Sequence, residues 1–504
     1  MNLYRTAAVV TFFNAAEHCL GFLYRIILSR TLGAEGLGVY QAAYSMFAVF
    51  LTVSASGLPV TLSRTISKHR ARGNRLGEQA ATSAAVSVSL CFSVPMTVLL
   101  FLFRDPFSGV FADPRCADVF YILLAGLSLT SVYAVLRGCF WGNKRFFAYS
   151  FVELAEEMLR IGAGIALLLL LPAANGITLT AVAVLISYLF SFLLAAVYFF
   201  ARGGKLRSPR GELRPMLLSS LPVTAMRTSS SLLSSLISLL FPLMLRAAGY
   251  TASAAMREYG VVYGMVMPVM AVPCAFIGSI ALVLVPELAE QYYRGNRKEV
   301  TALIGRALRA TLLIAGALLP FYLVCGGDVG ILLYSDAQSG ALISLCAPLL
   351  VPMSLTMITT SLLNSLGCEK KTLAVFLCGS AGMLACVLTL PRFLGSGALA
   401  VGMLCDNLIC ALLSLMLLRK RAGALHMGKF LLRLCCAVLP AALAGFAVRK
   451  GLFLVLGFLP ALALTMLFLL LAEGALFAVL RLVGFRGFFT RFLRKKSKKS
   501  LANS

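Results

Sequence analysis

The sequence has few of the residues with which enzymes usually work. Its 504 residues include three histidines and one tryptophan, and 13% of them are charged. It contains no H-E-x-x-H or G-x-S-x-G motif. The stretch from Gly423 to Lys429 spells G-x-x-x-x-G-K, but Phe430 stands where a P-loop needs Ser or Thr. We therefore expect a protein that is not an enzyme and that carries no cofactor.

The cysteines also lack the spacing of a metal or disulfide site. The 14 cysteines are scattered, no C-x-x-C occurs, and only Cys435 and Cys436 are adjacent. We interpret them as small residues of an apolar interior rather than as metal ligands or a disulfide set.

Long apolar runs dominate the chain. Hydrophobic residues make up 60% of it, and the mean hydropathy is +0.91, which is more apolar surface than a soluble protein can bury. Runs of about 18 or more apolar residues recur from residue 6 to residue 480, and each can cross roughly 30 Å of hydrocarbon as a helix. The first run carries Glu17, His18 and Arg25, which argues against a cleaved signal peptide. We predict an all-α integral membrane protein with about 14 transmembrane helices.

The net charge of +26 follows a topological pattern and does not point to nucleic acid. If the N-terminus is cytoplasmic, 34 of the 45 basic residues fall on the cytoplasmic side, eight on outer turns and three inside spans. This asymmetry obeys the positive-inside rule. It predicts a multi-pass membrane protein with both termini in the cytoplasm and an even number of spans. The basic tail, which also carries Phe488, Phe489 and Phe492, is predicted to contact anionic lipid.

A short internal echo suggests two repeats. Arg30 ends the first run and is followed by Gly38-Val39-Tyr40, while Arg246 ends the seventh and is followed by Gly260-Val261-Val262-Tyr263. Parallel repeats around a central site are a transporter architecture. The expected organisation is an N-terminal six-helix lobe at 1–204, a C-terminal six-helix lobe at 205–422, two extra transmembrane helices at 423–480 and a basic cytoplasmic tail at 481–504.

The fifth span carries four charged residues on one helical face. Glu153, Glu156, Glu157 and Arg160 are spaced i, i+3, i+4 and i+7. Charges inside a span usually face a bundle interior or a cavity. One arginine cannot neutralise three carboxylates, so a further partner, a proton or an ion is implied. We expect the acids to line a cavity or couple an ion and Arg160 to add a cation; an ion-pair ladder against a neighbouring helix is the structural alternative.

The seventh span places Arg227 on a stripe of hydroxyl residues. The stripe consists of Thr224, Thr228, Ser231, Ser234, Ser235 and Ser238. Small hydroxyl residues favour helix packing, but packing does not account for the arginine. Because a guanidinium can hold a phosphate or carboxylate bidentately, Arg227 is a candidate substrate-binding residue, with Thr224 and Ser231 lining the cavity.

The first span adds four polar candidates. Asn14, His18 and Arg25 lie within about 40° of one another around the helix, with Glu17 beside them. Arg25 is a candidate substrate-binding cation, although near the outer end of the span it could also snorkel. Asn14 and Glu17 are expected to line the cavity, and His18 is more typical of a satisfied interior histidine.

The run from Leu20 to Tyr40, L-G-F-L-Y-R-I-I-L-S-R-T-L-G-A-E-G-L-G-V-Y, resembles the opening of the stage V sporulation protein B family. Further segments resemble the same family over nearly the whole chain: Gly57-Leu58-Pro59-Val60, Arg137-Gly138 with Trp141-Gly142, Glu156 to Arg160, and Leu221-Pro222. Proteobacterial-type lipid II flippases carry Arg-Asp where this chain has Tyr24 and Arg25, so the cation lies one residue later and the acid is absent. This departure favours the sporulation or polysaccharide branch.

The resemblance implies membership of the multidrug/oligosaccharidyl-lipid/polysaccharide (MOP) exporter superfamily. It implies a MATE/lipid II flippase-like fold, with two six-helix lobes around a central cavity plus two C-terminal helices. It also implies a lipid-linked oligosaccharide substrate carried on undecaprenyl diphosphate, and the sporulation branch is tied to spore-cortex peptidoglycan. Cell-wall synthesis proteins are the partners that such a role suggests.

Three functions fit these residues. A flippase for a peptidoglycan precursor such as lipid II would hold the diphosphate with Arg25, Arg227 and Arg160, and we expect this function. A proton- or Na⁺-coupled antiporter of organic cations would use Glu17 and the fifth-span acids, although the arginines would repel its substrate. A non-transporting scaffold for wall assembly would have little use for charges inside the membrane. Transport would draw on an H⁺ or Na⁺ gradient, the membrane potential or the substrate gradient.

Overall fold

The computed structural model describes residues 3–209, 211–423 and 427–482, and every regular element in these ranges is helical. The first half contains α1 (Leu3–Ala55), α2 (Leu58–Ala71), α3 (Arg75–Leu102), α4 (Arg104–Ser108), α5 (Pro114–Ala125), α6 (Leu127–Gly142), α7 (Phe146–Leu170), α8 (Gly176–Ala201) and α9 (Leu213–Ala247). Then follow α10 (Ala252–Gly260), the π-helix η1 (Val261–Val266), α11 (Met267–Tyr293), α12 (Arg297–Tyr334), α13 (Ala337–Cys346), the 3₁₀ turn η2 (Ala347–Leu349) and α14 (Leu350–Ser365). The last helices are α15 (Glu369–Thr389), α16 (Pro391–Leu394), α17 (Gly397–Ala422), α18 (Gly428–Val455) and α19 (Phe458–Val479).

Short polar residues start many of these helices. The side chains of Asn74, Asp113, Asn175, Thr251 and Asn296 each accept a hydrogen bond from a backbone N–H in the first turn of the helix that follows. Such caps satisfy N–H groups that have no partner inside the helix. The sequence therefore marks the helix starts at its few polar turns and fills the intervening runs with apolar residues.

Eleven described helices are long and apolar enough to cross a membrane, or twelve if the pair α5–α6, bent by 48°, forms one span. This confirms a multi-pass, all-helical membrane protein; the expected number of about fourteen spans stays a prediction. One candidate, Phe12–Ala71, is 60 residues long, and it contains Gly33 in a non-helical conformation with φ of 69°. α7 is not among the eleven candidate spans, although its 25 residues are long enough to cross a membrane. It is the helix that carries Glu153, Glu156, Glu157 and Arg160.

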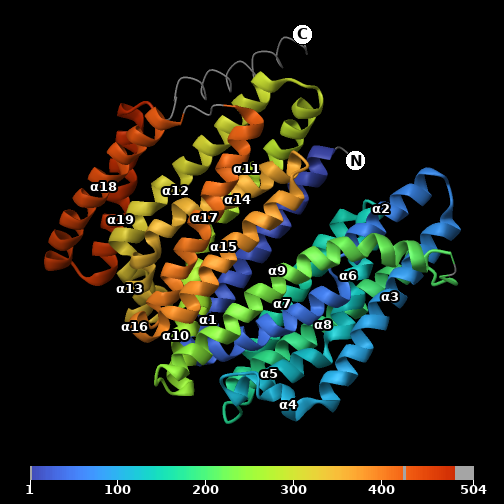
Figure 1. Cartoon of the computed structure of the whole chain (residues 1–504). Coiled ribbons are helices and arrows are strands. Elements are labelled where there is room, and N and C mark those ends of the chain that lie inside the picture. The colour runs from blue at the N-terminus through green and yellow to red at the C-terminus, as the bar shows by residue number, and fades with distance from the viewer. Residues whose placement is uncertain (1–2, 210, 424–426, 483–504) are drawn as a thin grey trace, which may run out of the picture. The chain divides into compact units, whose positions relative to one another are not determined.

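The helices group into two units by their contacts. The first comprises the described residues of Met1–Pro268 together with Met383–Leu399, and the second those of Val269–Gly382 and Ala400–Ser504. The core of the first unit joins α2, α3, α6, α8 and α9 around Leu62, Ile66 and Phe140. In the second unit, α18 and α19 pack side by side and against α12 (Figure 1). The predicted lobe boundaries at residues 204 and 422 stay a prediction.

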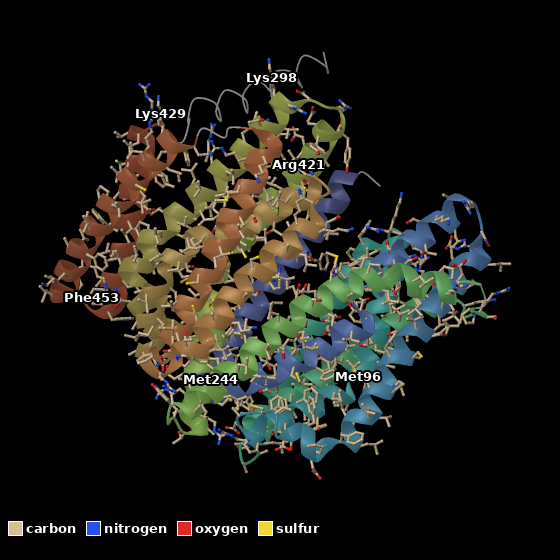
Figure 2. All side chains as sticks on the ribbon, viewed as in Figure 1. Met96, Met244, Lys298, Arg421, Lys429 and Phe453 are labelled. Carbon is tan, nitrogen blue, oxygen red and sulfur yellow. The ribbon has the colours of Figure 1, made fainter. Side chains whose placement is uncertain are left out.

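The basic residues of the second unit gather at the ends of its helices. Figure 2 shows Lys298, Arg421 and Lys429 at one end of this unit and Phe453 toward the other. At the first end, Arg421 Nη1 donates to the hydroxyl of Tyr292 at 3.1 Å. This end carries residues that the charge pattern assigns to the cytoplasm. Most of the predicted basic tail, residues 483–504, lies outside the described residues.

Candidate functional site

A polar cavity of about 300 Å³ lies within the first unit. Residues of α1, α6, α7, α8 and α9 line it, together with Ser56 between α1 and α2. The charged lining residues are Glu17, Arg137, Glu153, Glu156, Glu157, Arg160 and Arg227. The hydroxyl-bearing ones are Tyr44, Thr52, Ser56, Thr130, Tyr133 and Tyr188. Six of the ten site residues expected from the sequence therefore meet at one place.

The charged face of α7 forms ion pairs inside this cavity. Arg160 Nη2 lies 2.6 Å from Glu156 Oε1, and Arg160 Nη1 lies 2.6 Å from Glu157 Oε2. Both glutamates are 8% exposed. The guanidinium also donates to Ser187 Oγ and lies 6.0 Å from the centre of the Tyr188 ring. Because two carboxylates already bind Arg160, its positive charge is largely neutralised within the protein.

The third acid of this face has a partner that sequence reasoning missed. Arg137 Nη1 of α6 lies 3.0 Å from Glu153 Oε1, and its guanidinium stacks over the Trp141 ring at 5.3 Å. Arg137 is one of the 34 basic residues that the charge pattern places on the cytoplasmic side. The excess of acids on α7 was the signal for a second cation, and Arg137 supplies it. Four carboxyl and three guanidinium groups thus line the cavity.

Arg227 differs from the other two cavity arginines. Among the described residues, no carboxylate lies within ion-pair distance of it, and its Nη1 donates to the backbone carbonyl of Ser56 at 3.0 Å. Ser56 lies at the break between α1 and α2, where Pro59 in the first turn of α2 has no N–H to donate. The Arg227 side chain is exposed, so its remaining N–H groups face open space.

A glycine contact sets the distance between this break and α9. A Cβ added at Gly57 would lie 2.4 Å from Thr224 Oγ1 and 2.5 Å from the carbonyl oxygen of Ser220. Only a residue without a side chain allows so close an approach. Thr224 therefore contacts the break, one turn of α9 before Arg227, but it does not belong to the cavity lining.

The remaining predicted residues lie elsewhere in the first unit. Arg25 Nη1 donates to the backbone carbonyl of Tyr263 in η1 at 3.3 Å. Asn14 is half-buried on α1 and Ser231 is half-buried on α9, and neither lines the cavity. Glu17 does line it, and no ion-pair partner occurs for Glu17 within the described ranges. The structure therefore brings Glu17, the α7 cluster and Arg227 together but leaves Asn14, Arg25, Thr224 and Ser231 outside the lining.

Comparison with known proteins gives a family and a fold. Residues 3–291 match the model of the family described as polysaccharide biosynthesis protein. Stage V sporulation protein B of Bacillus subtilis (strain 168) is 25% identical over 348 residues, which are 65% of this chain and 66% of that protein. Lipid II flippase MurJ of the same organism is 23% identical over 399 residues, 73% of each chain. The match thus spans about two thirds of the length of the sporulation protein.

A solved structure shows the same fold. It is an inward-facing multidrug resistance MATE family transporter of the MOP superfamily, 17% identical, with a TM-score of 0.64. The match covers 82% of this chain and 96% of the other. The MATE-like fold expected from the sequence is thereby confirmed, and family and fold agree with a transporter rather than an enzyme.

Proposed function

The chain belongs to the polysaccharide biosynthesis protein family, and on that premise we propose that it is a flippase for an undecaprenyl-diphosphate-linked oligosaccharide. The substrate would be a peptidoglycan precursor such as lipid II, which crosses from the inner to the outer leaflet by alternating access. The names of two relatives, a sporulation protein and a lipid II flippase, support this substrate class. A role in sporulation or in vegetative wall synthesis fits equally.

The state of Arg227 carries the proposal. A diphosphate needs a cation that the protein has not already neutralised. Within the described part of the chain, Arg227 has only the Ser56 carbonyl as a hydrogen-bond partner. A planar guanidinium can hold two phosphate oxygens at once. The hydroxyl groups of Tyr44, Thr52 and Thr130 line the same cavity and suit a sugar.

The other predicted site residues take supporting roles in this proposal. Arg160 and Arg25 are substrate cations that become available when their present contacts to Glu157 and to the Tyr263 carbonyl are exchanged. Asn14, Thr224 and Ser231 would line the path when the helices move. Glu17 and the α7 acids would couple an H⁺ or Na⁺ ion.

The proposed topology has fourteen spans and two cytoplasmic termini in a bacterial cytoplasmic membrane. At about 1.5 Å per residue, the 60 residues of Phe12–Ala71 are far too long for one crossing of roughly 30 Å. Dividing them at Gly33, counting α5–α6 as one span and adding α7 gives fourteen. These would form the lobes 1–204 and 205–422 and the pair 423–480. Anionic lipids and cell-wall synthesis proteins are the proposed partners.

Flipping of a fluorescent undecaprenyl-diphosphate-linked sugar in proteoliposomes tests the proposal. Wild type should flip the probe and Arg227→Ala should lose most of this activity. Arg214→Ala is the matched control, since it removes an exposed arginine from the same helix. Equal flipping by wild type and Arg227→Ala would contradict the role of Arg227, and no flipping by wild type would contradict the function.

The acid-rich lining supports one alternative, a proton- or Na⁺-coupled antiporter of organic cations. Glu17 faces the cavity without an ion-pair partner in the described part of the chain, as an exchanging acid requires. The same proteoliposomes with an imposed pH or Na⁺ gradient and an organic-cation probe test it. Cation export that Glu17→Gln abolishes, without flipping of the lipid probe, would select this alternative.

A further inference from the structure

The last described helix carries a carboxyl group that the cavity does not use. Glu473 of α19 is 5% exposed, and its Oε1 is buried without a hydrogen-bond partner among the described residues. The exposed side of α19 is lined by large side chains such as Leu467 and Leu471. Glu473 shares the opposite, buried face with Thr465, Leu469 and Phe477. The carboxyl group is therefore turned into the second unit.

The layers on either side of Glu473 are apolar. One turn before it, Leu469 packs on Gly445 of α18, where an added Cβ would lie 2.5 Å from Leu469 Cδ2 and 3.3 Å from Val324 of α12. One turn after it, Phe477 packs in a cluster with Leu312 of α12 and with Leu434, Ala437 and Val438 of α18. Glu473 thus lies between two layers that close the contact of α19 with α12 and α18.

The charged groups of these two neighbours are found at their ends. Toward one end of α12, Arg306 pairs with Glu299, and Arg309 Nη2 lies near Gly305. Toward the other end, Asp328 and Arg449 form a bidentate pair at 2.6 and 2.8 Å. On α18, Lys429, Arg433 and Lys450 are exposed, as are the thiols of Cys435 and Cys436. Among the described residues, no cation therefore forms an ion pair with Glu473.

Two oxygen acceptors of α12 lie near the Phe477 layer, one helical turn from Glu473. Pro320 inside α12 has no N–H, so the carbonyl of Gly316 loses its partner in the helix. Gly316 packs against Leu434 and Val438 of α18, in the layer next to Phe477. Thr311 Oγ1 on the same helix is also buried without a partner. A carboxylate can only accept hydrogen bonds, so the Gly316 carbonyl offers no hydrogen bond to an ionised Glu473.

We propose that Glu473 is a proton-binding site of the α18–α19 hairpin, distinct from the polar cavity. The carboxyl holds a proton while α19 packs against α12, because an unpaired charge in this apolar layer costs far more than a neutral acid. Protonation of one side chain would thereby stabilise the packed position of the last two helices.

Infrared difference spectroscopy of the full chain in liposomes tests this site directly. The spectrum of wild type minus Glu473→Gln at neutral pH should contain the C=O band of a protonated carboxylic acid, and the band should shift in D₂O. The control is Glu290→Gln, which removes an exposed glutamate that pairs with Arg294 at 2.6 Å and should give carboxylate bands only. Carboxylate bands in place of the acid band for Glu473 would overturn the proposal.

Thermal unfolding provides a second measurement that needs no spectral assignment. Glu473→Met replaces a neutral acid by a neutral side chain of similar length, so this variant should fold with a Tm close to that of wild type. Loss of folding in both the Gln and Met variants would overturn the proposal, because an acid that is already neutral makes no ionic contact to lose.

Discussion

Arg227 Nη1 donates to the backbone carbonyl of Ser56 at 3.0 Å, and this bond holds Arg227 at the break between α1 and α2. Arg227 is also the cavity arginine for which no carboxylate partner occurs in the described ranges. This contact joins α9 to the junction of α1 and α2. It orients the guanidinium and leaves its other N–H groups for a ligand. The affinity for a ligand that binds there would therefore depend on the position of α9 relative to the break.

Arg227→Lys tests whether geometry matters as well as charge. Lysine keeps the positive charge but cannot hold two phosphate oxygens in a fixed plane. If one charge-assisted hydrogen bond is lost at about 2 kcal/mol, binding should weaken by roughly thirtyfold. Tryptophan-fluorescence or radioligand titration with the diphosphate lipid should rank the proteins as wild type, then Lys, then Ala. Equal affinity for wild type and Arg227→Lys would argue for a purely electrostatic role.

Gly57→Ala should disturb the contact between the break and α9. The new Cβ would lie 2.4 Å from Thr224 Oγ1 and 2.5 Å from a backbone oxygen, which cannot rotate away. We expect a loss of about 1–3 kcal/mol in stability, as for overpacked cores, together with reduced transport. Gly162→Ala is the control, since no atom lies within 4 Å of its added Cβ. Measured Tm values should fall for the first variant only.

Arg160→Gln should destabilise the first unit because it leaves two buried carboxylates without their cation. Side chains of Glu156 and Glu157 are each 11% exposed in these pairs. Breaking a buried ion pair on one side costs about 3–5 kcal/mol. Adding Glu156→Gln and Glu157→Gln to the same protein should restore much of the loss, as thermal unfolding would show. A triple variant no better than Arg160→Gln would mean that the arginine acts by packing.

Local patterns predicted much of the site because they depend on helix geometry alone. The i, i+3, i+4, i+7 spacing placed the α7 charges on one face, and that face lines the cavity. The partner of Glu153 could not be predicted in the same way. Arg137 and Glu153 lie on different helices, so no i, i+3 or i+4 spacing relates them. Only the packing of α6 on α7 brings their atoms to 3.0 Å.

The glycine motifs found in the sequence acquire a physical reason in the fold. A Cβ at Gly138 would lie 2.5 Å from Pro59 Cα, and one at Gly142 would lie 2.8 Å from Ile66 Cβ. The Gly-Leu-Pro motif of α2 and the two glycines of α6 are thus two sides of one helix contact.

Glu473 illustrates the opposite case, since a single acid in an apolar run has no pattern that reveals its neighbours.

Stability should depend on pH through Asp113, which precedes the first residue of α5. Burial alone would raise the pKa of Asp113, but the guanidinium and backbone N–H of Arg115 bind its carboxylate and hold the pKa below the ordinary 3.8. A lowered pKa means that this stabilisation is present above about pH 4 and is lost as the pH falls through the folded-state value. Tm measured against pH should fall more steeply below pH 4 in wild type than in Asp113→Asn. Parallel curves would assign the acid sensitivity to other groups.

The segments around Gly38 and Gly260, which form the two halves of the internal echo, contact each other in the first unit. We expect this contact to separate when the outer end of that unit opens. A Cβ at Gly38 would lie 2.0 Å from the carbonyl oxygen of Met256, and one at Gly260 would lie 1.8 Å from that of Ala34. Next to it, the thiol of Cys116 is fully buried, 3.9 Å from the Met256 sulfur.

Gly38→Ala should push α10 away from α1 and expose this thiol. We expect faster labelling by a membrane-impermeant maleimide added from outside, and Cys116→Ser should remove the extra signal. Gly162→Ala is again the control. Gly249→Ala is unsuitable, because the φ of 98° at Gly249 strains any residue other than glycine. If labelling of Cys116 stays slow in Gly38→Ala while Tm falls, the glycine contact is a fixed part of the fold. Fast labelling with an unchanged Tm would instead mark it as a contact that the protein makes and breaks.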